Sequence, residues 1–383
     1  MKILFLAPQP FFQERGTPIA VRLALTVLSE RLSTASNDSD SRIDLLTYHE
    51  GSNIDLPCVR LFRIPCPPFV RGVRPGISIK KLICDLYFLL CAIRLVIKER
   101  KVGGYDVVHA VEESVFVAMV IKLFFGIPYI YDMDSSLALQ LTEKWRIFRP
   151  LYPLLYLAEK AAVKWSLSVV PVCDALAAIA DRHGSSYTHI LRDISMLDPA
   201  QAQKAGITLK EELGIPAGDL MILYIGNLEP YQGIDLLLDS FAQLESSSLS
   251  SHLVIIGGNE AHIKNYREKA EKLRISERTY FTGPKPVANL SSYLLNADIL
   301  VSPRIRGNNT PMKIYSYLHS GKAIVATNLP THTQVMDNSV AVLADPNPAA
   351  FAAALRELIL DERKRKELGS NARRLAEKRY TFD

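Results

Sequence analysis

Short apolar runs alternate along the chain with longer segments in which apolar residues recur every three or four positions. Residues 2–7, KILFLA, form the first run, and residues 18–32 show the helical periodicity. The later runs and helical segments of this half are at residues 43–48, 105–110, 114–125 (helical), 128–133, 152–165 (helical) and 167–172. Apolar strands separated by helices predict a parallel sheet that is covered on both faces.

The same pattern restarts after a polar stretch near residues 195–205. Residues 220–244 give a strand, a glycine loop and a helix, and a single helix is expected from Pro348 to Lys378. The strands between them are expected at residues 252–258, 279–283, 298–303 and 341–345. The sequence therefore predicts two successive doubly wound α/β domains with a boundary near residues 196–207. Ligands of such sheets bind beyond the carboxyl ends of the strands, and the cleft between two domains is the expected site.

The composition agrees with a globular protein of two domains. The chain has 383 residues, of which 48% are hydrophobic and 22% charged. Its five cysteines form no C-x-x-C pair, which favours a reducing cytosol and offers no zinc site. The longest apolar stretch, Leu82–Ile97, contains Asp85 and Arg94 and is shorter than the ~20 residues of a membrane span. We expect a helix there, against the core or the membrane surface.

The positive charge of the chain is concentrated in one region. The net charge is +5, yet residues 58–101 hold six Arg and four Lys against Asp85 and Glu99. One interpretation is a solvated basic face. The other is a patch for an anionic membrane surface, which neighbouring aromatic residues such as Phe62 and Phe69 favour. No motif typical of nucleic-acid binding is present, so no nucleic-acid partner is expected.

Two glycine loops follow predicted strands. Gly16 and Thr17 stand directly before Pro18, which suits the first turn of a helix. In the second half, Gly226 and Asn227 end a strand and a further glycine opens the next helix. Glycine at a helix start lets backbone N–H groups approach an anion, although a plain tight turn has the same sequence. Two such loops would suit a diphosphate ligand.

A third loop precedes the segment TPMKIYSYLHSG. Thr310 is the expected N-cap of a helix, Pro311 its first residue and Gly321 its end. The start of a helix has unpaired N–H donors, so this loop is expected to meet a ligand or to serve as a cap alone.

These segments together resemble the family 4 glycosyltransferases, which are retaining enzymes. GNLEPYQGIDLLLDSF, FTGPKPVANLSSYLLNADILVSPR and NNTPMKIYSYLHSGKAIVATNLP have the order and spacing of that family. GTPIAVRLAL, YDVVHA and FGIPYIYDMD agree more loosely. The resemblance implies the GT-B fold, with two doubly wound Rossmann-like domains facing an interdomain cleft. It implies an acceptor-binding domain at residues 1–200, a sugar-nucleotide-binding domain at 201–370, and a tail at 371–383 that returns toward the first domain.

The resemblance also implies which residues bind the donor, and this chain departs from the family there. The family's Arg and Lys for the donor diphosphate fall at Asn227 and Gln232. Of its two glutamates, the first falls near Asn308, and the second, which usually holds the donor ribose, falls at Ser316. Losing two cations would cost about 3–6 kcal/mol. As a hypothesis, Lys313 replaces one of them and Arg304 or Arg306 the other. The remaining implied donor residues are Gly16, Thr17, Gly226, Gly283, Pro284, Asn309, Thr310, Pro311 and Met312.

Candidate acceptor-side residues follow two strands of the first half. The D-x-D of Asp132 and Asp134 invites a metal-dependent GT-A interpretation, but a single-domain fold does not account for the second series of strands and helices. In the family, this strand end faces the acceptor, so Asp134 would polarise the acceptor hydroxyl or cap the next helix. His109 stands where many family members have a histidine, or is a structural residue. Glu112 and its neighbour Glu113 are weaker candidates.

The sequence thus predicts a cytoplasmic, metal-independent, retaining glycosyltransferase, without a cofactor and peripheral to the inner face of the cell membrane. Its expected partners are a nucleotide sugar, a glycan or lipid-linked acceptor, and an anionic membrane surface at residues 58–101. The altered positions leave two alternatives open. One is a sugar-nucleotide-binding protein with little catalysis. The other is a different GT-B activity such as epimerisation or phosphorolysis, although no lysine-held cofactor or strong phosphate cage is evident.

Overall fold

The chain folds into two compact units. The computed structural model describes residues 1–9, 16–35, 41–73, 78–144, 146–198, 208–244 and 250–381. The units are Met1–Arg192 and Asp193–Asp383, so the division lies eight residues before the predicted 200/201. Hydrogen bonds explain the difference, because the backbone N–H groups of Met196 and Asp198 donate to Ser316 Oγ (2.9 Å) and Ser291 Oγ (2.8 Å) of the second unit.

The first unit contains a parallel six-stranded sheet in the order β3-β2-β1-β4-β5-β6. The strands are β1 (Lys2–Ala7), β2 (Arg42–Thr47), β3 (Val59–Arg63), β4 (Val107–Val111), β5 (Tyr129–Met133) and β6 (Ser168–Pro171). The sequence pattern predicted all of them except β3, a half-buried edge strand that carries Arg60 and Arg63.

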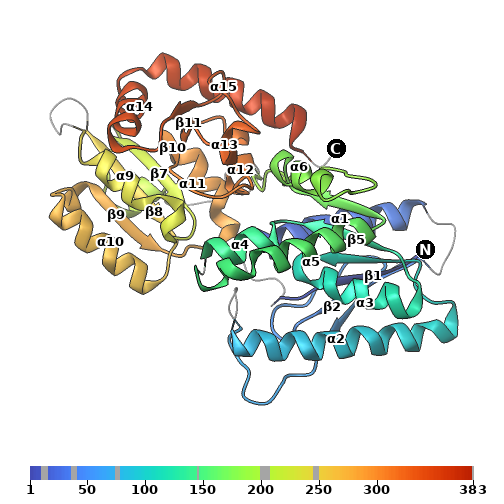
Figure 1. Ribbon diagram of the computed structural model, residues 1–383. Coiled ribbons are helices and arrows are strands. Elements are labelled where there is room, and N and C mark those ends of the chain that lie inside the picture. The colour runs from blue at the N-terminus through green and yellow to red at the C-terminus, as the bar shows by residue number, and fades with distance from the viewer. Residues whose placement is uncertain are drawn as a thin grey trace. The chain divides into compact units, whose positions relative to one another are not determined.

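Helices cover both faces of this sheet, as Figure 1 shows. They are α1 (Gly16–Ala35), α2 (Ile79–Glu99), α3 (Val115–Phe125), α4 (Leu137–Lys144), α5 (Tyr152–Trp165) and α6 (Asp174–Arg182). Successive residues of a strand point to opposite faces. Leu4 and Leu6 of β1 accordingly lie in one apolar core with residues of α2, α3 and α5, whereas Phe5 packs with Val21 and Leu25 of α1. Among the described residues, none of the helices combines the length and apolarity needed to cross a membrane.

The second unit has a second parallel six-stranded sheet, in the order β12-β11-β10-β7-β8-β9. Its strands are β7 (Leu220–Ile225), β8 (Ser251–Ile256), β9 (Thr279–Gly283), β10 (Ile299–Ser302), β11 (Ala323–Thr327) and β12 (Val342–Ala344). Its helices are α8 (Leu209–Glu212), α9 (Ile234–Phe241), α10 (Glu260–Lys272), α11 (Leu290–Asn296), α12 (Lys313–His319), α13 (Pro330–Thr333), α14 (Pro348–Leu360) and α15 (Glu362–Arg379).

Two helix boundaries differ from the prediction. The closing helix is broken at Asp361, whose carboxylate accepts a hydrogen bond from the N–H of Lys364 at 2.8 Å and caps α15. Residues 371–379, predicted as a tail, continue α15, which packs against α12 and β11 of the second unit. Helix α12 begins at Lys313, because the first turn is formed by N–H groups bonded to Pro311 and Met312; Thr310 and Pro311 precede the helix.

Each sheet reverses its strand order once, between β1 and β4 in the first unit and between β7 and β10 in the second. Open parallel sheets bind ligands beyond the carboxyl ends of the strands at such a switch point. The loops after these four strands are therefore the places to look for functional side chains.

Candidate functional site

The loops that follow β7 and β10 meet at the switch point of the second sheet. The β7 loop runs through Gly226 into a short 3₁₀ turn, Pro230–Gln232. The β10 loop runs from Pro303 to Met312. A hydrogen bond from Ile305 N to Tyr231 O, 3.0 Å long, joins the two. The structure thus brings together two loops that the sequence pattern predicts separately as ligand-binding.

Lys313 is the first residue of α12 and points its ammonium at the β7 loop. Its Nζ is 3.8 Å from the centre of the Tyr224 ring, within the range of a cation–π contact. It is shielded from solvent and has no hydrogen-bond partner among the described residues. Gly226 permits the approach, because a Cβ built there would come within 3.2 Å of Nζ and its φ of 151° suits glycine.

The ammonium of Lys313 is held in an unfavourable environment. Burial lowers its pKa well below the ordinary value, and the nearby positive charge of Arg304 lowers it further. A buried cation without a hydrogen-bond partner is costly and rare in folded proteins. This lysine is therefore poised to gain from a negatively charged ligand.

Arg304 is the second cation of the site. It is only 7% exposed and its guanidinium lies over the Tyr231 ring, 5.3 Å from the centroid. Its Nε donates to Arg306 O at 2.7 Å and its Nη2 to Asn309 Oδ1 at 2.8 Å, so its own loop fixes its orientation. A Cβ at Gly307, whose φ is 116°, would come within 2.2 Å of Nη2. Arg306, the other cation proposed from the sequence, is exposed.

Two further buried polar atoms of these loops have no partner among the described residues. They are Thr310 Oγ1 and Gln232 Oε1, on side chains that are 4% and 7% exposed. With Lys313 Nζ, three predicted donor-binding residues carry an unsatisfied polar atom. Because native proteins pair nearly all such atoms, this concentration indicates a ligand-binding site for oxygen-rich groups.

A hydrogen-bond network that was not predicted from the sequence fixes the start of the β10 loop. His332 Nδ1 donates to Thr327 O (2.9 Å), and Nε2 accepts from Ser302 Oγ (2.8 Å). Thr327 Oγ1 in turn donates to Arg304 O (2.5 Å). Burial lowers the pKa of His332 to about 3, and the charges of Lys313 and Arg304 act in the same direction, which keeps the ring neutral. No local sequence signal identifies this network, since its members come from three separate segments.

Three other predicted donor residues, Asn227, Asn308 and Ser316, accept hydrogen bonds within the second unit. Asn227 is exposed, and its carbonyl accepts from Tyr224 Oη at 2.7 Å. The carbonyl of Asn308 accepts from Gln334 at 3.1 Å, and Pro311 and Met312 lead into α12. Ser316 is buried with its Oγ accepting from Met196 N. Their contact with the donor, including the ribose role of Ser316, stays a prediction.

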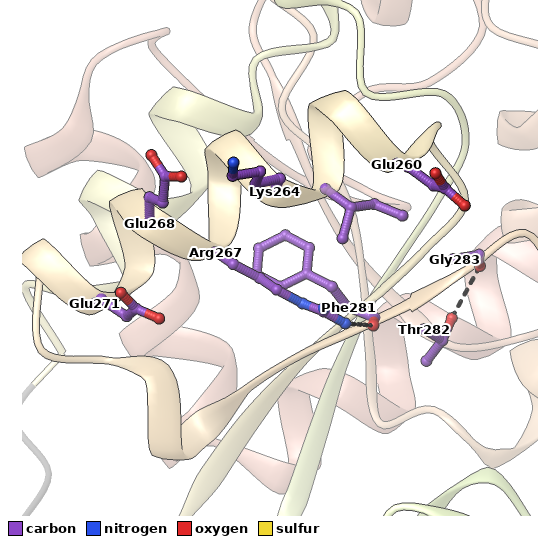
Figure 2. A pocket seen from close by; sticks show the side chains of 9 residues that line it. Glu260, Lys264, Arg267, Glu268, Glu271, Phe281, Thr282 and Gly283 are labelled. Carbon is purple, nitrogen blue, oxygen red and sulfur yellow. Dashed lines mark hydrogen bonds between the residues drawn. The ribbon is translucent and has the colours of Figure 1, made fainter.

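Gly283 ends β9 and lines an open groove of about 440 Å³ between that edge strand and α10 (Figure 2). The other lining side chains are mostly charged, and Arg267 donates to Phe281 O at 3.0 Å (Figure 2). The lining residues do not include Lys313 or Arg304. Pro284, predicted with Gly283 as a donor-binding residue, follows at an exposed position.

In the first unit, His109 and Asp132 form a buried pair. His109 Nε2 lies 2.9 Å from Asp132 Oδ2, and the imidazole stacks on Phe5 with ring centroids 4.3 Å apart. The partner of His109 is thus the first aspartate of the D-x-D. Asp134 lies partly buried just beyond the end of β5. The loop before α1 lies outside the described residues, and Gly16 and Thr17 begin that helix.

Glu112, only a weak candidate in the sequence, occupies the switch point of the first sheet. It follows β4 directly and has a φ of 52°, which is strained for a non-glycine residue. Its carboxylate accepts from Ser135 Oγ at 2.9 Å. Burial, and then the charge of Glu113, raises the pKa of Glu112 to about 8. Glu113 itself is ion-paired with Lys81 of α2.

Comparison with known proteins identifies the second unit. Residues 207–375 match the sequence model of the family described as glycosyl transferases group 1. These residues belong to that family. A D-inositol 3-phosphate glycosyltransferase of Corynebacterium glutamicum is 26% identical over 186 residues, 47% of this chain. The match spans 44% of that relative's own length, less than half.

Solved structures extend the likeness to the whole chain. Sucrose-phosphate synthase of Thermosynechococcus elongatus has a TM-score of 0.79 at 18% identity, covering 100% of this chain and 95% of that one. Anabaena HepE, solved in complex with UDP-glucose, has a TM-score of 0.73 at 15% identity, covering 100% and 96%. The chain has the GT-B fold, and the predictions of family and fold class are confirmed.

Proposed function

We propose that the protein is a glycosyltransferase that moves a sugar from a nucleotide sugar to a glycan or lipid-linked acceptor. The single observation that carries the proposal is the buried ammonium of Lys313, which has no hydrogen-bond partner in the described part of the chain and lies at the switch point of a group 1 glycosyltransferase domain. The UDP-glucose complex of HepE, which shares the fold, supports a nucleotide sugar as the ligand.

The diphosphate of the donor would lie between Lys313 and Arg304. When the sugar–phosphate bond breaks, negative charge grows on the nucleoside diphosphate, and fixed cations beside it stabilise that charge. Arg304 is already oriented by Asn309 and by the carbonyl of Arg306, so it loses little freedom on binding. Thr310 Oγ1 would donate to a phosphate or sugar oxygen, and Gln232 Oε1 would accept from a sugar hydroxyl. In this arrangement Lys313 and Arg304 replace the two cations that the family has at the positions of Asn227 and Gln232.

The acceptor would bind at the switch point of the first sheet. Its hydroxyl would donate a hydrogen bond to the carboxylate of Asp134 or Glu112. A carboxylate with a pKa near working pH is suited to accept a proton and return it. Through its hydrogen bond to Asp132, His109 would position the β5 end that carries Asp134. We further propose a retaining, metal-independent reaction at the cytosolic face of the membrane, with the donor phosphate assisting deprotonation of the acceptor.

Titration calorimetry with UDP, GDP and their sugars tests the donor site directly. We expect at least one nucleotide sugar to bind, and Lys313→Ala and Arg304→Ala each to weaken it about 10- to 150-fold. Unchanged affinity in both variants would overturn the assignment of the diphosphate site. Transfer that persists in excess EDTA, with a product of unchanged anomeric configuration by NMR, would support the metal-independent, retaining reaction. Tight binding without turnover of any donor would favour a sugar-nucleotide-binding protein instead.

A further inference from the structure

Three neighbouring helices of the first unit present apolar side chains to solvent. Helix α2 packs against α3, and α3 against α5, on one face of the sheet (Figure 1). Their inner sides fill the core, while their outer sides carry large exposed hydrophobic residues. These include Leu86, Leu90, Leu123, Phe124, Leu154 and Leu157. We call this outer surface of α2, α3 and α5 the three-helix face.

The exposed leucines of α2 are not scattered. Leu82, Leu86 and Leu90 follow one another at intervals of four residues, which places them on one side of the helix. Leu86 is 57% exposed and Leu90 58%. Contiguous exposed apolar surface of this kind marks an interaction site, because a protein gains nothing by keeping it in water.

The charges on the same helices are of one sign. The carboxylates of Glu99 and Glu159 are buried, and that of Asp85 is bonded to Lys81. By contrast, Arg94 and Lys98 of α2 and Lys160 and Lys164 of α5 are exposed. The ion pairs found among the described residues give none of these four a carboxylate partner.

We propose that the three-helix face docks on an anionic lipid bilayer. Exposed apolar side chains and exposed cations without an ion-pair partner among the described residues, on the same helices, match the two layers of such a surface, acyl chains beneath phosphate-bearing headgroups. A second copy of the chain is a poor partner, because two faces of the same positive sign would repel each other. The prediction from the sequence placed the membrane contact in residues 58–101. The exposed apolar side chains of α3 and α5 extend the proposed contact beyond those residues.

The face is connected to the proposed acceptor side of the enzyme. Lys81, in the first turns of α2, pairs with Glu113, which adjoins Glu112 at the switch point. Docking of α2 on a bilayer would therefore bring a lipid-linked acceptor toward the carboxylate of Glu112. This last step rests on the proposed function, whereas binding to the bilayer does not.

Sedimentation with lipid vesicles tests the proposal on the full chain. We expect the protein to pellet with vesicles that contain phosphatidylglycerol and to stay in solution with phosphatidylcholine alone. The double variant Leu86→Glu/Leu90→Glu should lose the binding, whereas Leu360→Glu, an exposed leucine of α14 that is 59% exposed, should keep it. Arg94→Ala/Lys98→Ala should weaken binding about fivefold per cation. Arg363→Ala/Lys378→Ala, on exposed positions of α15, should leave it unchanged.

Several outcomes would overturn the proposal. These are a wild-type protein that ignores both kinds of vesicle, binding that does not depend on phosphatidylglycerol, and full binding by Leu86→Glu/Leu90→Glu. A wild-type dimer that this double variant dissociates would show that the face binds a second copy instead. Circular dichroism and nucleotide-sugar affinity of the double variant check that it is folded. If no nucleotide sugar binds the wild type, the proposed function fails, while vesicle binding is still decided separately.

Discussion

The ammonium of Lys313 lies 3.8 Å from the centre of the Tyr224 ring and has no hydrogen-bond partner among the described residues. The face of an aromatic ring offsets part of the cost of burying a cation, but it supplies no hydrogen-bond acceptor. The fold therefore tolerates the lysine without a ligand, and an anionic ligand would supply the missing hydrogen-bond acceptor. This relationship gives a prediction in which stability and binding change in opposite directions.

Replacing Lys313 by Met should leave the free energy of unfolding unchanged or raise it, because the variant removes a buried amino group without a hydrogen-bond partner among the described residues and keeps the apolar contact with Tyr224. Donor affinity should fall about 10- to 150-fold. Urea unfolding and titration calorimetry measure the two effects. A variant that is clearly less stable and binds donor normally would assign Lys313 a purely structural role.

Donor binding should also take up protons through Lys313. The free protein holds the lysine with a lowered pKa, and a diphosphate beside it restores the pKa toward its ordinary value. Between those two pKa values, the bound form carries a proton that the free form lacks. Binding enthalpies in buffers of different ionisation enthalpy count the protons. The count should be positive for the wild type and for the exposed control Lys366→Met, and near zero for Lys313→Met.

The sequence predicted the sheets well because their strands are buried on both faces and form continuous apolar runs. It missed β3, where Arg60 of an edge strand pairs with the buried Asp44 instead of continuing such a run. The loops of the donor site were also predictable, since they follow strands at a switch point. The sequence could not predict which buried polar side chains have a hydrogen-bond partner or which residues have a strained backbone. Nothing in the local sequence shows that Lys313 is unpaired or that Glu112 is strained, because both depend on distant segments.

Glu112 should trade stability for activity. Its folded pKa of about 8 lies above the ordinary value near 4.5, so the folded state holds a proton that the unfolded state has lost between these pH values. The wild type should therefore lose stability as pH rises through this window. Glu112→Gln should abolish that loss, being more stable than the wild type at pH 9 and not at pH 4.

The same variant should slow transfer to the acceptor at unchanged donor affinity. It should also remove the rise in rate that the wild type shows as Glu112 ionises. Asp134→Asn provides a matched comparison at the neighbouring strand end. Urea unfolding at both pH values and rates from pH 6 to 9 measure these effects. If Glu112→Gln transfers at the wild-type rate with the wild-type pH profile, Glu112 has no role in the reaction.

His332 should make the second unit sensitive to acid. Its folded pKa of about 3 lies below the ordinary 6.5, so the unfolded state binds a proton first as pH falls. Stability should therefore decline between pH 6.5 and pH 3, by up to about 1.4 kcal/mol per pH unit for this one group. His332→Ala should lose this slope. At pH 8 it should also lose about 2–4 kcal/mol through broken buried hydrogen bonds and a cavity. His262→Ala, at a half-buried position of α10, is the control. A slope that survives in His332→Ala would contradict the assignment.

Ser316 separates a structural role from donor recognition. Its Oγ accepts from Met196 N, which ties the segment that enters the second unit to α12. Ser316→Ala would remove this partly buried hydrogen bond and should lower the free energy of unfolding by about 1 kcal/mol. With the hydroxyl acting as this anchor, nucleotide-sugar affinity should change less than twofold. Ser316→Glu, which restores the carboxylate of the family, should destabilise further by burying a charge, without tightening the donor. Calorimetry on both variants decides the matter: a large loss of donor affinity in Ser316→Ala, or a gain in Ser316→Glu, would establish the ribose contact that the family resemblance implies.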